Sequence, residues 1–333
     1  MSVFTPVSFE DACTLIARYD LGDCTELEPI AAGVENSNFF LSTTRGRYVL
    51  TVFEKIPRAD LDFYMGLMLH LHQRGIPCAA PLVDRSGAIL QTLHNKPVAL
   101  VTRLNGSDIN RPTAEDCFAI GAALADMHLA AQTFTQPMHN WRGLSWWQQH
   151  TARLRPHLTE RENALLAAEI AYQANFDQLS LPRGIIHGDL FRDNVLWDQR
   201  DKAAVPQMID FYFACHEQLL LDLAITANDW CLDFACYPEA AMQPELLNAL
   251  IQGYNRKRPL TSEERAAWPQ MLRAAALRTW LGRLDYHHFP RDSASEFTLT
   301  HPKDHPFSER LLCFHIDSAG RQFSHPGKTH GRF

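Results

Sequence analysis

The sequence predicts an α+β fold of two lobes, a β-rich N-terminal lobe and a mainly helical C-terminal lobe. Short β-rich runs separated by turns fill most of the first hundred residues, and long helical patterns dominate after them. A length of 333 residues suits one large domain or two modest ones. We place the N-terminal lobe at residues 1–103, the C-terminal lobe at 104–313 and an irregular tail at 314–333, because the end of the chain is rich in Ser, His, Pro and Gly.

The N-terminal lobe is expected to begin with an amphipathic helix and to continue as strands around a second helix. Ser8 precedes acidic residues, and apolar residues recur at helical spacing through Tyr19. A helix over 61–74 ends at Gly75, with a proline beyond it, which is the usual stop signal. The strands are expected at residues 26–32, 36–42, 48–53, 89–93 and 97–102, with a turn at 94–96.

The C-terminal lobe is expected to contain long helices with brief apolar strands between them. Helical patterns cover residues 113–131, 158–179 and 219–223, and a further helix begins near residue 261. Thr113 with Asp116 caps the first of these helices, and Thr261 with Glu264 forms a capping box before the last. The strands are expected at residues 184–186, 195–197 and 206–209.

Charge and composition exclude several classes of function. The net charge is −7, so no overall basic field draws the chain to nucleic acid or to an acidic membrane. The eight cysteines show no C-x-x-C spacing, which favours reduced thiols. The sequence shows no signal-peptide pattern and no apolar run long enough to span a bilayer. We therefore expect a cytoplasmic protein with no nucleic acid, no membrane and no required protein partner.

Residues 187–194 carry the strongest functional signal in the sequence. They match H-x-D-x-x-x-x-N, the spacing of a kinase catalytic loop, and apolar residues that predict strands flank them on both sides. The apolar run 206–209 then delivers Asp210, sixteen residues after Asn194. This pattern predicts the transfer of a phosphoryl group.

The three polar residues of this pattern have the chemistry that phosphoryl transfer needs, because the reaction depends on positioning and on charge neutralisation. We assign Asp189 as the catalytic residue that orients the acceptor hydroxyl and takes its proton. We assign Asn194 and Asp210 as ligands of Mg²⁺, which prefers a few protein oxygens together with phosphate oxygens. The expected cofactors are ATP and Mg²⁺.

Other interpretations of the same segment stay open. Asp and Asn are also common in turns, so an ordinary turn between strands is the alternative to a catalytic loop. We expect His187 to be structural and to hydrogen-bond within the loop, with a proton carrier as the alternative. Residues 219–223 follow soon after Asp210, which leaves little room for a peptide-binding platform and indicates a small acceptor.

The turn at 33–38 occupies the place of a hairpin turn that covers phosphates. It lacks the repeated glycines of G-x-G-x-x-G, so an ordinary turn is an equal alternative to a phosphate contact. The candidate nucleotide contacts in this turn are Gly33, Asn36, Ser37 and Asn38.

Thr51 stands on the strand where a phosphate-pairing lysine is expected, and we include it among the nucleotide contacts. Arg47 and Lys55 share its predicted strand face, so either could reach a phosphate in place of the missing lysine or remain at a solvated surface. Arg103 and Leu104 belong to the linker between the lobes, whose backbone is expected to meet adenine.

Taken together, these segments resemble the aminoglycoside-phosphotransferase-like kinases of the protein-kinase-like fold, and most closely the homoserine kinases of that fold. The resemblance extends to about residue 313. It is carried by residues 27–38, 47–54, 187–194, 209–213, 222–224, 228–230 and 273–278, with Trp280 and Arg283. It implies transfer of the γ-phosphoryl group of ATP to L-homoserine, giving O-phospho-L-homoserine, a step of threonine biosynthesis.

A site for zwitterionic homoserine needs a carboxylate for the ammonium group and an arginine for the carboxylate. The candidates are Asp229, Arg278 and Arg283, with ordinary ion pairs on helix surfaces as the alternative. We expect Asp222 to brace the catalytic loop. Two other functions stay open: a kinase of the same fold for choline, ethanolamine, a sugar or an aminoglycoside, and a catalytically dead nucleotide-binding module, which the missing lysine would fit.

Overall fold

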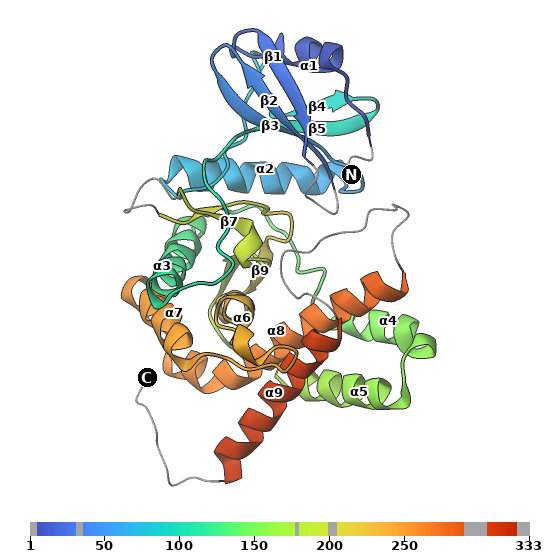
Figure 1. Ribbon diagram of the computed structural model, residues 1–333, viewed down its shortest axis with the longest axis vertical. Helices are drawn as coiled ribbons and strands as arrows, with labels where there is room; N and C mark the ends of the chain where they lie inside the picture. Colours follow the sequence, from blue (N-terminus) through green and yellow to red (C-terminus); the bar gives the residue numbers. More distant parts are fainter. Residues whose placement is uncertain (1–4, 31–35, 177–179, 199–204, 290–304, 325–333) are drawn as a thin grey trace.

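The N-terminal strands form one antiparallel sheet in the computed structural model, which describes residues 5–30, 36–176, 180–198, 205–289 and 305–324 (Figure 1). The strand order is β1-β2-β3-β5-β4. The strands are β1 (Cys24–Pro29), β2 (Ser37–Thr43), β3 (Gly46–Val52), β4 (Leu90–Leu93) and β5 (Lys96–Thr102). His94 and Asn95 have positive φ angles of 49° and 61° and make the tight turn between β4 and β5. This confirms the hairpin predicted there.

Two helices cover the sheet from opposite sides. Helix α1 (Phe9–Ile16) packs on the outer face, and α2 (Arg58–Gln73) lies between the sheet and the helical lobe (Figure 1). Leu61, Leu67 and Leu71 of α2 are fully buried in the largest hydrophobic cluster, which continues into the C-terminal lobe. Helix α2 therefore couples the sheet to the catalytic half of the molecule.

The remaining described elements are mostly helical, as predicted. The helices are α3 (Ala114–Ala131), α4 (Leu144–Leu154), α5 (Glu160–Ala174), α6 (Leu219–Trp230), α7 (Pro244–Lys257), α8 (Ser262–His288) and α9 (His305–Ser324), with short 3-10 turns η1 (Arg155–His157), η2 (Arg192–Asn194) and η3 (Phe234–Cys236). Two hairpins complete the lobe, β6 (Arg183–Ile186) with β9 (Cys215–Gln218) and β7 (Val195–Leu196) with β8 (Gln207–Met208). The predicted α+β, two-lobed fold class is confirmed.

Both predicted capping pairs are present. The Thr113 hydroxyl accepts from the backbone N–H of Asp116 at 3.2 Å, and the Asp116 carboxylate accepts from the backbone N–H of Thr113 at 2.8 Å. Thr261 and Glu264 make the same reciprocal pair. These boxes satisfy backbone donors that have no partner inside the helix, which is why the two helix starts could be predicted from the sequence.

The prediction of an irregular tail at 314–333 is wrong for residues 314–324, which continue helix α9. Phe307, Leu311 and Leu312 are buried against the rest of the lobe, and α9 packs along α8. These apolar residues recur at helical spacing within a segment of polar composition, so composition alone was misleading. The boundary at residue 103 remains our proposal, and strand β9 was not predicted.

Two expectations about the whole chain can be compared with the described residues. All eight cysteines lie in the described ranges and are free thiols, with no disulfide among them. Within the same ranges, no helix combines the length and apolar character that crossing a membrane requires.

Candidate active site

The catalytic loop lies between two hairpins that fix both of its ends. Strand β6 leads into the loop and pairs with β9, while β7 leads out of it and pairs with β8. The backbone N–H of Ile209 donates to the carbonyl oxygen of Asn194 at 3.0 Å. This bond places Asp210 beside Asn194, although sixteen residues separate them in the chain.

Asp222 of α6 anchors the start of the loop, as predicted. Its carboxylate is 0% exposed and accepts from the backbone N–H groups of His187 at 2.7 Å and Gly188 at 2.9 Å. Burial alone would raise the pKa of Asp222, but the hydrogen bond with His128 at 2.9 Å and the two backbone donors hold it below its usual value. The carboxylate therefore stays charged, and it ties α6 to the loop.

Asp229 and Trp230, at the end of α6, anchor the middle of the loop. One oxygen of Asp229 accepts from the backbone N–H of Arg192 at 2.8 Å and from its Nε at 3.0 Å, and both side chains are buried. The indole N–H of Trp230 donates to the carbonyl oxygen of Leu190 at 3.1 Å. Asp229 thus positions the loop, and a contact of Asp229 with a substrate ammonium group stays a prediction.

The C-terminal helix α9 reaches the same anchor through His315. The ring Nε2 of His315 lies 2.8 Å from Oδ1 of Asn228, the neighbour of Asp229, and Nδ2 of Asn228 donates to the carbonyl oxygen of Leu272 at 2.9 Å. Because Nδ2 is a donor, Oδ1 is the acceptor, and a neutral His315 ring donates to it. Helix α9, which was not predicted, therefore supports α6, the helix that holds the catalytic loop.

We predict that His315 makes stability fall as the solution becomes acidic. Burial and the charge of Arg273 lower its pKa from 6.5 to about 3. Above pH 6.5 the histidine is neutral in folded and unfolded chains alike. Between pH 6.5 and pH 3 only the unfolded chain takes up the proton, so the folded state loses stability as the pH falls, by about 2 kcal/mol at pH 5.

Urea unfolding of the wild type and of His315→Gln at pH 7.5, 6.5 and 5.0 measures this effect, because glutamine keeps a donor for Asn228 but does not titrate. We expect the stability difference between the two proteins to shift by about 2 kcal/mol in favour of the variant between pH 7.5 and pH 5.0. Other histidines titrate in both proteins and cancel in the difference. Parallel pH profiles would contradict the prediction.

The assigned catalytic residue Asp189 and the two assigned metal ligands, Asn194 and Asp210, belong to this region and are half-buried, so a ligand can reach them. Nδ2 of Asn194 donates to the carbonyl oxygen of Asp189 at 2.7 Å and to its Oδ2 at 3.1 Å. With Nδ2 committed as a donor, Oδ1 of Asn194 is the atom that can meet a cation. Asp210 has a positive φ of 62°, a conformation uncommon outside glycine, which turns the residue that follows the β8 segment.

The side-chain oxygens of Asn194 and Asp210 fit a magnesium ion. Among the described residues, no group of three or more His, Cys, Asp or Glu side chains could hold a metal by itself. Magnesium in nucleotide sites is typically held by one or two protein oxygens together with phosphates and water, and Asn194 and Asp210 supply oxygens of that kind. Their role as ligands remains a prediction that the geometry favours.

His187 is fully buried beneath the loop. Its Nε2 donates to the carbonyl oxygen of Ile209 at 3.0 Å, and its ring packs at 4.5 Å from the ring of Phe211. Burial lowers its pKa in spite of the nearby charge of Asp222, so the ring is neutral. These contacts favour the structural role that the sequence suggested, because the ring spans the loop and the strand that delivers Asp210.

The candidate phosphate-covering turn lies partly outside the described residues, since Gly33 belongs to the range 31–35. Ser37 is buried, and its hydroxyl donates to Glu54 Oε1 at 2.6 Å. The Asn36 side chain accepts from the backbone N–H of Glu54 at 3.4 Å. Glu54 also forms an ion pair with Lys96. These contacts hold the base of the turn to the end of β3.

Thr51, at the position of the missing lysine, is a buried link between the lobes. Its hydroxyl donates to Oδ1 of Asn38 at 2.8 Å and also interacts with the hydroxyl of Tyr212. Burial and the charge of Asp210 raise the pKa of Tyr212, so the phenol stays neutral. The position therefore connects β2 with the segment that follows Asp210.

Arg47 and Lys55 do not share the buried environment of Thr51. Both are exposed, and Nη2 of Arg47 donates to Oδ1 of Asn105 in the linker at 3.1 Å. The guanidinium of Arg103 stacks 3.7 Å from the ring centre of Phe40. Contacts of Thr51, Asn36, Ser37, Asn38, Arg103 and Leu104 with a nucleotide remain predictions.

Arg278 of α8 is the strongest candidate for binding an anionic group. Its side chain is 4% exposed, with the guanidinium 5.9 Å from the ring centre of Phe213, three residues beyond Asp210. No hydrogen bond or ion pair engages this guanidinium within the described part of the chain. A buried arginine without a carboxylate partner is costly, and an anionic ligand would compensate for it.

Arg283, five residues further along α8, lies in the field of the loop carboxylates. Burial lowers its pKa, and the negative charges of Asp189, Asp193 and Asp229 oppose that shift. Arg283 thus lies within electrostatic reach of Asp189, the assigned catalytic residue, while its contact with a substrate carboxylate stays a prediction. Its guanidinium can draw a negatively charged group toward Asp189.

Two residues of this region, Arg142 and His128, were not predicted from the sequence. Arg142 lies 4.1 Å from the ring centre of Phe213 and 4.7 Å from that of Trp141. His128 connects Asp222 to the hydroxyl of Tyr254 at 2.8 Å. Neither residue belongs to a spaced motif. For His128, the only signal was a polar residue inside an apolar helix. For Arg142, it was a cluster of aromatic residues nearby in the sequence.

Comparisons with known proteins agree with this geometry. A family model described as the phosphotransferase enzyme family matches residues 26–281. A homoserine kinase of Methylobacillus flagellatus is 46% identical over 312 residues, covering 94% of this chain and 94% of that protein. A homoserine kinase of Burkholderia multivorans is 42% identical over 321 residues, covering 94% and 95%.

Solved structures of low sequence identity share the fold. A choline kinase from Cryptosporidium parvum superposes with a TM-score of 0.67 at 11% identity, covering 96% of this chain and 97% of that chain. An amicoumacin kinase in complex with AMP-PNP and Ca²⁺ gives a TM-score of 0.66 at 15% identity, covering 92% and 96%. The catalytic loop, the matching family model and the similar full-length relatives lead to one conclusion: the chain belongs to the phosphotransferase enzyme family and, within it, to the homoserine kinases.

Proposed function

We propose that this chain transfers the γ-phosphoryl group of ATP to the side-chain hydroxyl of L-homoserine and releases O-phospho-L-homoserine and ADP. The observation that carries this proposal is the meeting of Asp189, Asn194 and Asp210 at the loop, together with a buried arginine, Arg278. Its guanidinium lies 5.9 Å from the ring centre of Phe213, three residues beyond Asp210, and has no acidic partner in the described residues. The first three residues suit phosphoryl transfer, and the arginine suits an acceptor that bears a carboxylate.

The proposed reaction follows from the roles of the loop residues. Asp189 orients the acceptor hydroxyl and takes its proton as the oxygen attacks phosphorus, and the Asn194 amide fixes the orientation of the Asp189 carboxylate. Asn194 and Asp210 hold the metal side of the site. When bound, magnesium neutralises charge on the phosphates. Asp222 and Asp229 keep the loop rigid, so little reorganisation is needed during the reaction.

Recognition of the amino acid is proposed to rest on α8. Arg278 binds the homoserine carboxylate, and Arg283 holds the region near Asp189 electropositive for the transferred phosphoryl group. We place the reaction in threonine biosynthesis and in the cytoplasm, with ATP and Mg²⁺ as the cofactors. No protein partner is needed for this proposal.

ADP release with Mg·ATP across a panel of acceptors tests the proposal. The panel contains L-homoserine, D-homoserine, L-serine, choline, ethanolamine and kanamycin. We expect a large response to L-homoserine and at most a small one to the others. D-homoserine has the opposite configuration at the α-carbon, L-serine has a shorter side chain, and choline, ethanolamine and kanamycin have no carboxylate. A response confined to choline, ethanolamine or kanamycin would overturn the substrate assignment, and silence with all acceptors would favour a catalytically dead module.

Arg278→Gln is expected to raise the KM for L-homoserine about 10- to 100-fold, the usual range for losing a hydrogen bond between charged groups. The KM for ATP should change little, because the loop and α6 are untouched. Steady-state kinetics measure both values, and Arg256→Gln, an exposed arginine of α7, is the matched control. An unchanged KM for L-homoserine in Arg278→Gln would remove Arg278 from the acceptor site.

A further inference from the structure

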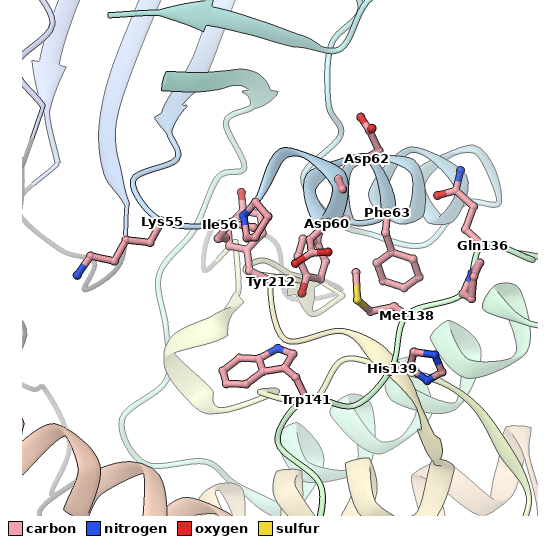
Figure 2. A pocket seen from close by; sticks show the side chains of 14 residues that line it. Lys55, Ile56, Asp60, Asp62, Phe63, Gln136, Met138, His139, Trp141 and Tyr212 are labelled. Atoms are coloured by element: carbon pink, nitrogen blue, oxygen red, sulfur yellow. The ribbon is translucent and has the colours of Figure 1, made fainter. Parts of the chain in front are cut away.

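A cavity of about 770 Å³ lies between the two lobes, apart from the catalytic loop (Figure 2). It is lined by the start of α2 and the preceding segment, by residues 136–139 and Trp141, and by Tyr212. None of Asp189, Asn194 and Asp210 lines it. Its volume falls within the range of about 300 to 1,000 Å³ that is typical of small-molecule sites.

The walls of this interlobe cavity are aromatic, with one inward-facing carboxylate. Figure 2 shows Asp60 beneath α2, between Tyr212 and Phe63 and on the side that faces Trp141. The side chain of Asp60 makes no hydrogen bond or ion pair with any other described residue. The indole of Trp141 is 45% exposed, although large apolar side chains are normally covered.

No basic side chain among the described residues pairs with the carboxylate of Asp60, which lies in the first turn of α2, where the helix dipole favours a negative charge. Lys55 lines the cavity, but its ammonium group points away from Asp60 in Figure 2. Asp62 also borders the cavity, but in Figure 2 its carboxylate projects from the opposite side of α2, as a spacing of two residues on a helix predicts. A positive charge placed among Asp60, Trp141 and Tyr212 would meet a carboxylate and two aromatic rings, which is the chemistry that attracts organic cations. The guanidinium of Arg142 already lies 4.7 Å from the ring centre of Trp141, so this ring accepts a cation in the structure itself.

We propose that the interlobe cavity is a second ligand site, for a small organic ammonium compound with an apolar or aromatic body, and that its occupancy is linked to the affinity for Mg·ATP. The ammonium group sits at Asp60, and the apolar body fills the space lined by Phe63, Met138 and Trp141. The site is distinct from the acceptor site of the proposed function and goes beyond it.

The linkage runs through Tyr212. Its ring packs edge-to-face on Phe53, at the end of β3, with ring centres 5.4 Å apart, and on Tyr64 of α2, with ring centres 5.9 Å apart. Tyr212 is also two residues beyond Asp210, the proposed metal ligand. A ligand that bridges α2 and Tyr212 restrains the segment carrying Asp210, so less order remains to be gained when Mg·ATP binds. Binding of either ligand therefore tightens binding of the other.

Isothermal titration with benzyltrimethylammonium tests the proposal, because this probe has a fixed positive charge and no hydroxyl that could accept phosphate. N-benzylacetamide serves as the neutral probe. The proteins are the wild type, Asp60→Asn and the matched control Asp62→Asn, which removes a charge two residues away on the outer side of the helix. We expect the cation to bind the wild type and Asp62→Asn, and to bind Asp60→Asn at least tenfold more weakly.

Titration of Mg·ATP with and without saturating probe tests the linkage. The probe should tighten Mg·ATP binding about threefold or more in the wild type and in Asp62→Asn, but not in Asp60→Asn. Equal binding of the cation to all three proteins, or of the neutral probe as tightly as the cation, would overturn the site. Unchanged Mg·ATP affinity with bound probe would overturn the linkage.

Competition with L-homoserine separates this site from the acceptor site. Saturating L-homoserine should leave the affinity for benzyltrimethylammonium within about twofold of its value without L-homoserine. Displacement of the probe would assign the cavity to the acceptor and overturn the proposal. These titrations measure binding without phosphoryl transfer. If the proposed kinase reaction is wrong, only the ADP-release assay shows it, and the binding results keep the same meaning.

Discussion

Replacing Asp189 with Asn is expected to lower kcat for L-homoserine phosphorylation about 1,000-fold, within the usual range for loss of a residue that transfers a proton. The side chain keeps its shape and can still accept the hydrogen bond from Asn194, whose Nδ2 lies 3.1 Å from Asp189 Oδ2. It can no longer take the proton of the acceptor hydroxyl. Because Asp189 is not assigned as a metal ligand, the affinity for Mg·ATP should stay within about threefold.

Asp210→Asn provides the contrast for this prediction. Loss of a carboxylate at the assigned metal site should weaken Mg·ATP binding as well as kcat. Steady-state ADP release gives kcat, and equilibrium titration of Mg·ATP gives the affinity for each variant. If Asp189→Asn kept more than a tenth of the wild-type rate, another group would have to accept the proton. If it weakened Mg·ATP as strongly as Asp210→Asn, Asp189 would belong to the metal site.

The catalytic loop could be predicted from the sequence because its residues are close together in the chain. The loop needs Asp189 and Asn194 at a fixed spacing, and the apolar strands on either side mark where it begins and ends. Asp210 could be predicted as well, since a short hairpin returns the chain to the same place. The hydrogen bond between Ile209 and Asn194 shows how that hairpin brings the two metal candidates together.

The roles of carboxylates on distant helices were harder to predict. Asp222 and Asp229 both lie on α6, and both hold the backbone of the loop. The sequence suggested this role for Asp222 but suggested a substrate contact for Asp229. Helical spacing shows that two side chains share a helix, but it does not tell which of them meets a loop and which meets a ligand. That choice depends on tertiary packing, here on the buried side chain of Arg192.

The C-terminal helix shows a different limit. Residues 305–324 contain enough polar residues and histidines to suggest an irregular tail, yet a few apolar side chains at helical spacing are sufficient to dock the helix on α8. The docked helix then places His315 against Asn228. A contact between residues so far apart in the chain has no local signal, so neither the helix nor its link to the catalytic loop could be predicted from composition.

Replacing Gly188 with Ala is expected to lower kcat at least about 100-fold and to reduce the free energy of unfolding by about 2–4 kcal/mol. Gly188 has a φ of 75°, where a side chain costs about 1–2 kcal/mol. An added Cβ would also lie 2.6 Å from the carbonyl oxygen of Phe213, which must then move. Movement of Phe213 shifts the segment that follows Asp210 and disturbs the ring beside Arg278, so the metal site and the acceptor site both lose their geometry.

Gly87→Ala distinguishes the energetic cost of a side chain at positive φ from the cost of the close contact with Phe213. Gly87 has a φ of 86°, and an added Cβ would meet no atom within 4 Å, so only the backbone cost applies. Its expected loss of stability is about 1 kcal/mol, with kcat unchanged. Urea unfolding and ADP release measure both variants. If Gly188→Ala lost no more stability and no more activity than Gly87→Ala, the close approach of Gly188 to Phe213 would have no part in holding the site, and the loop would be positioned by the contacts with α6 alone.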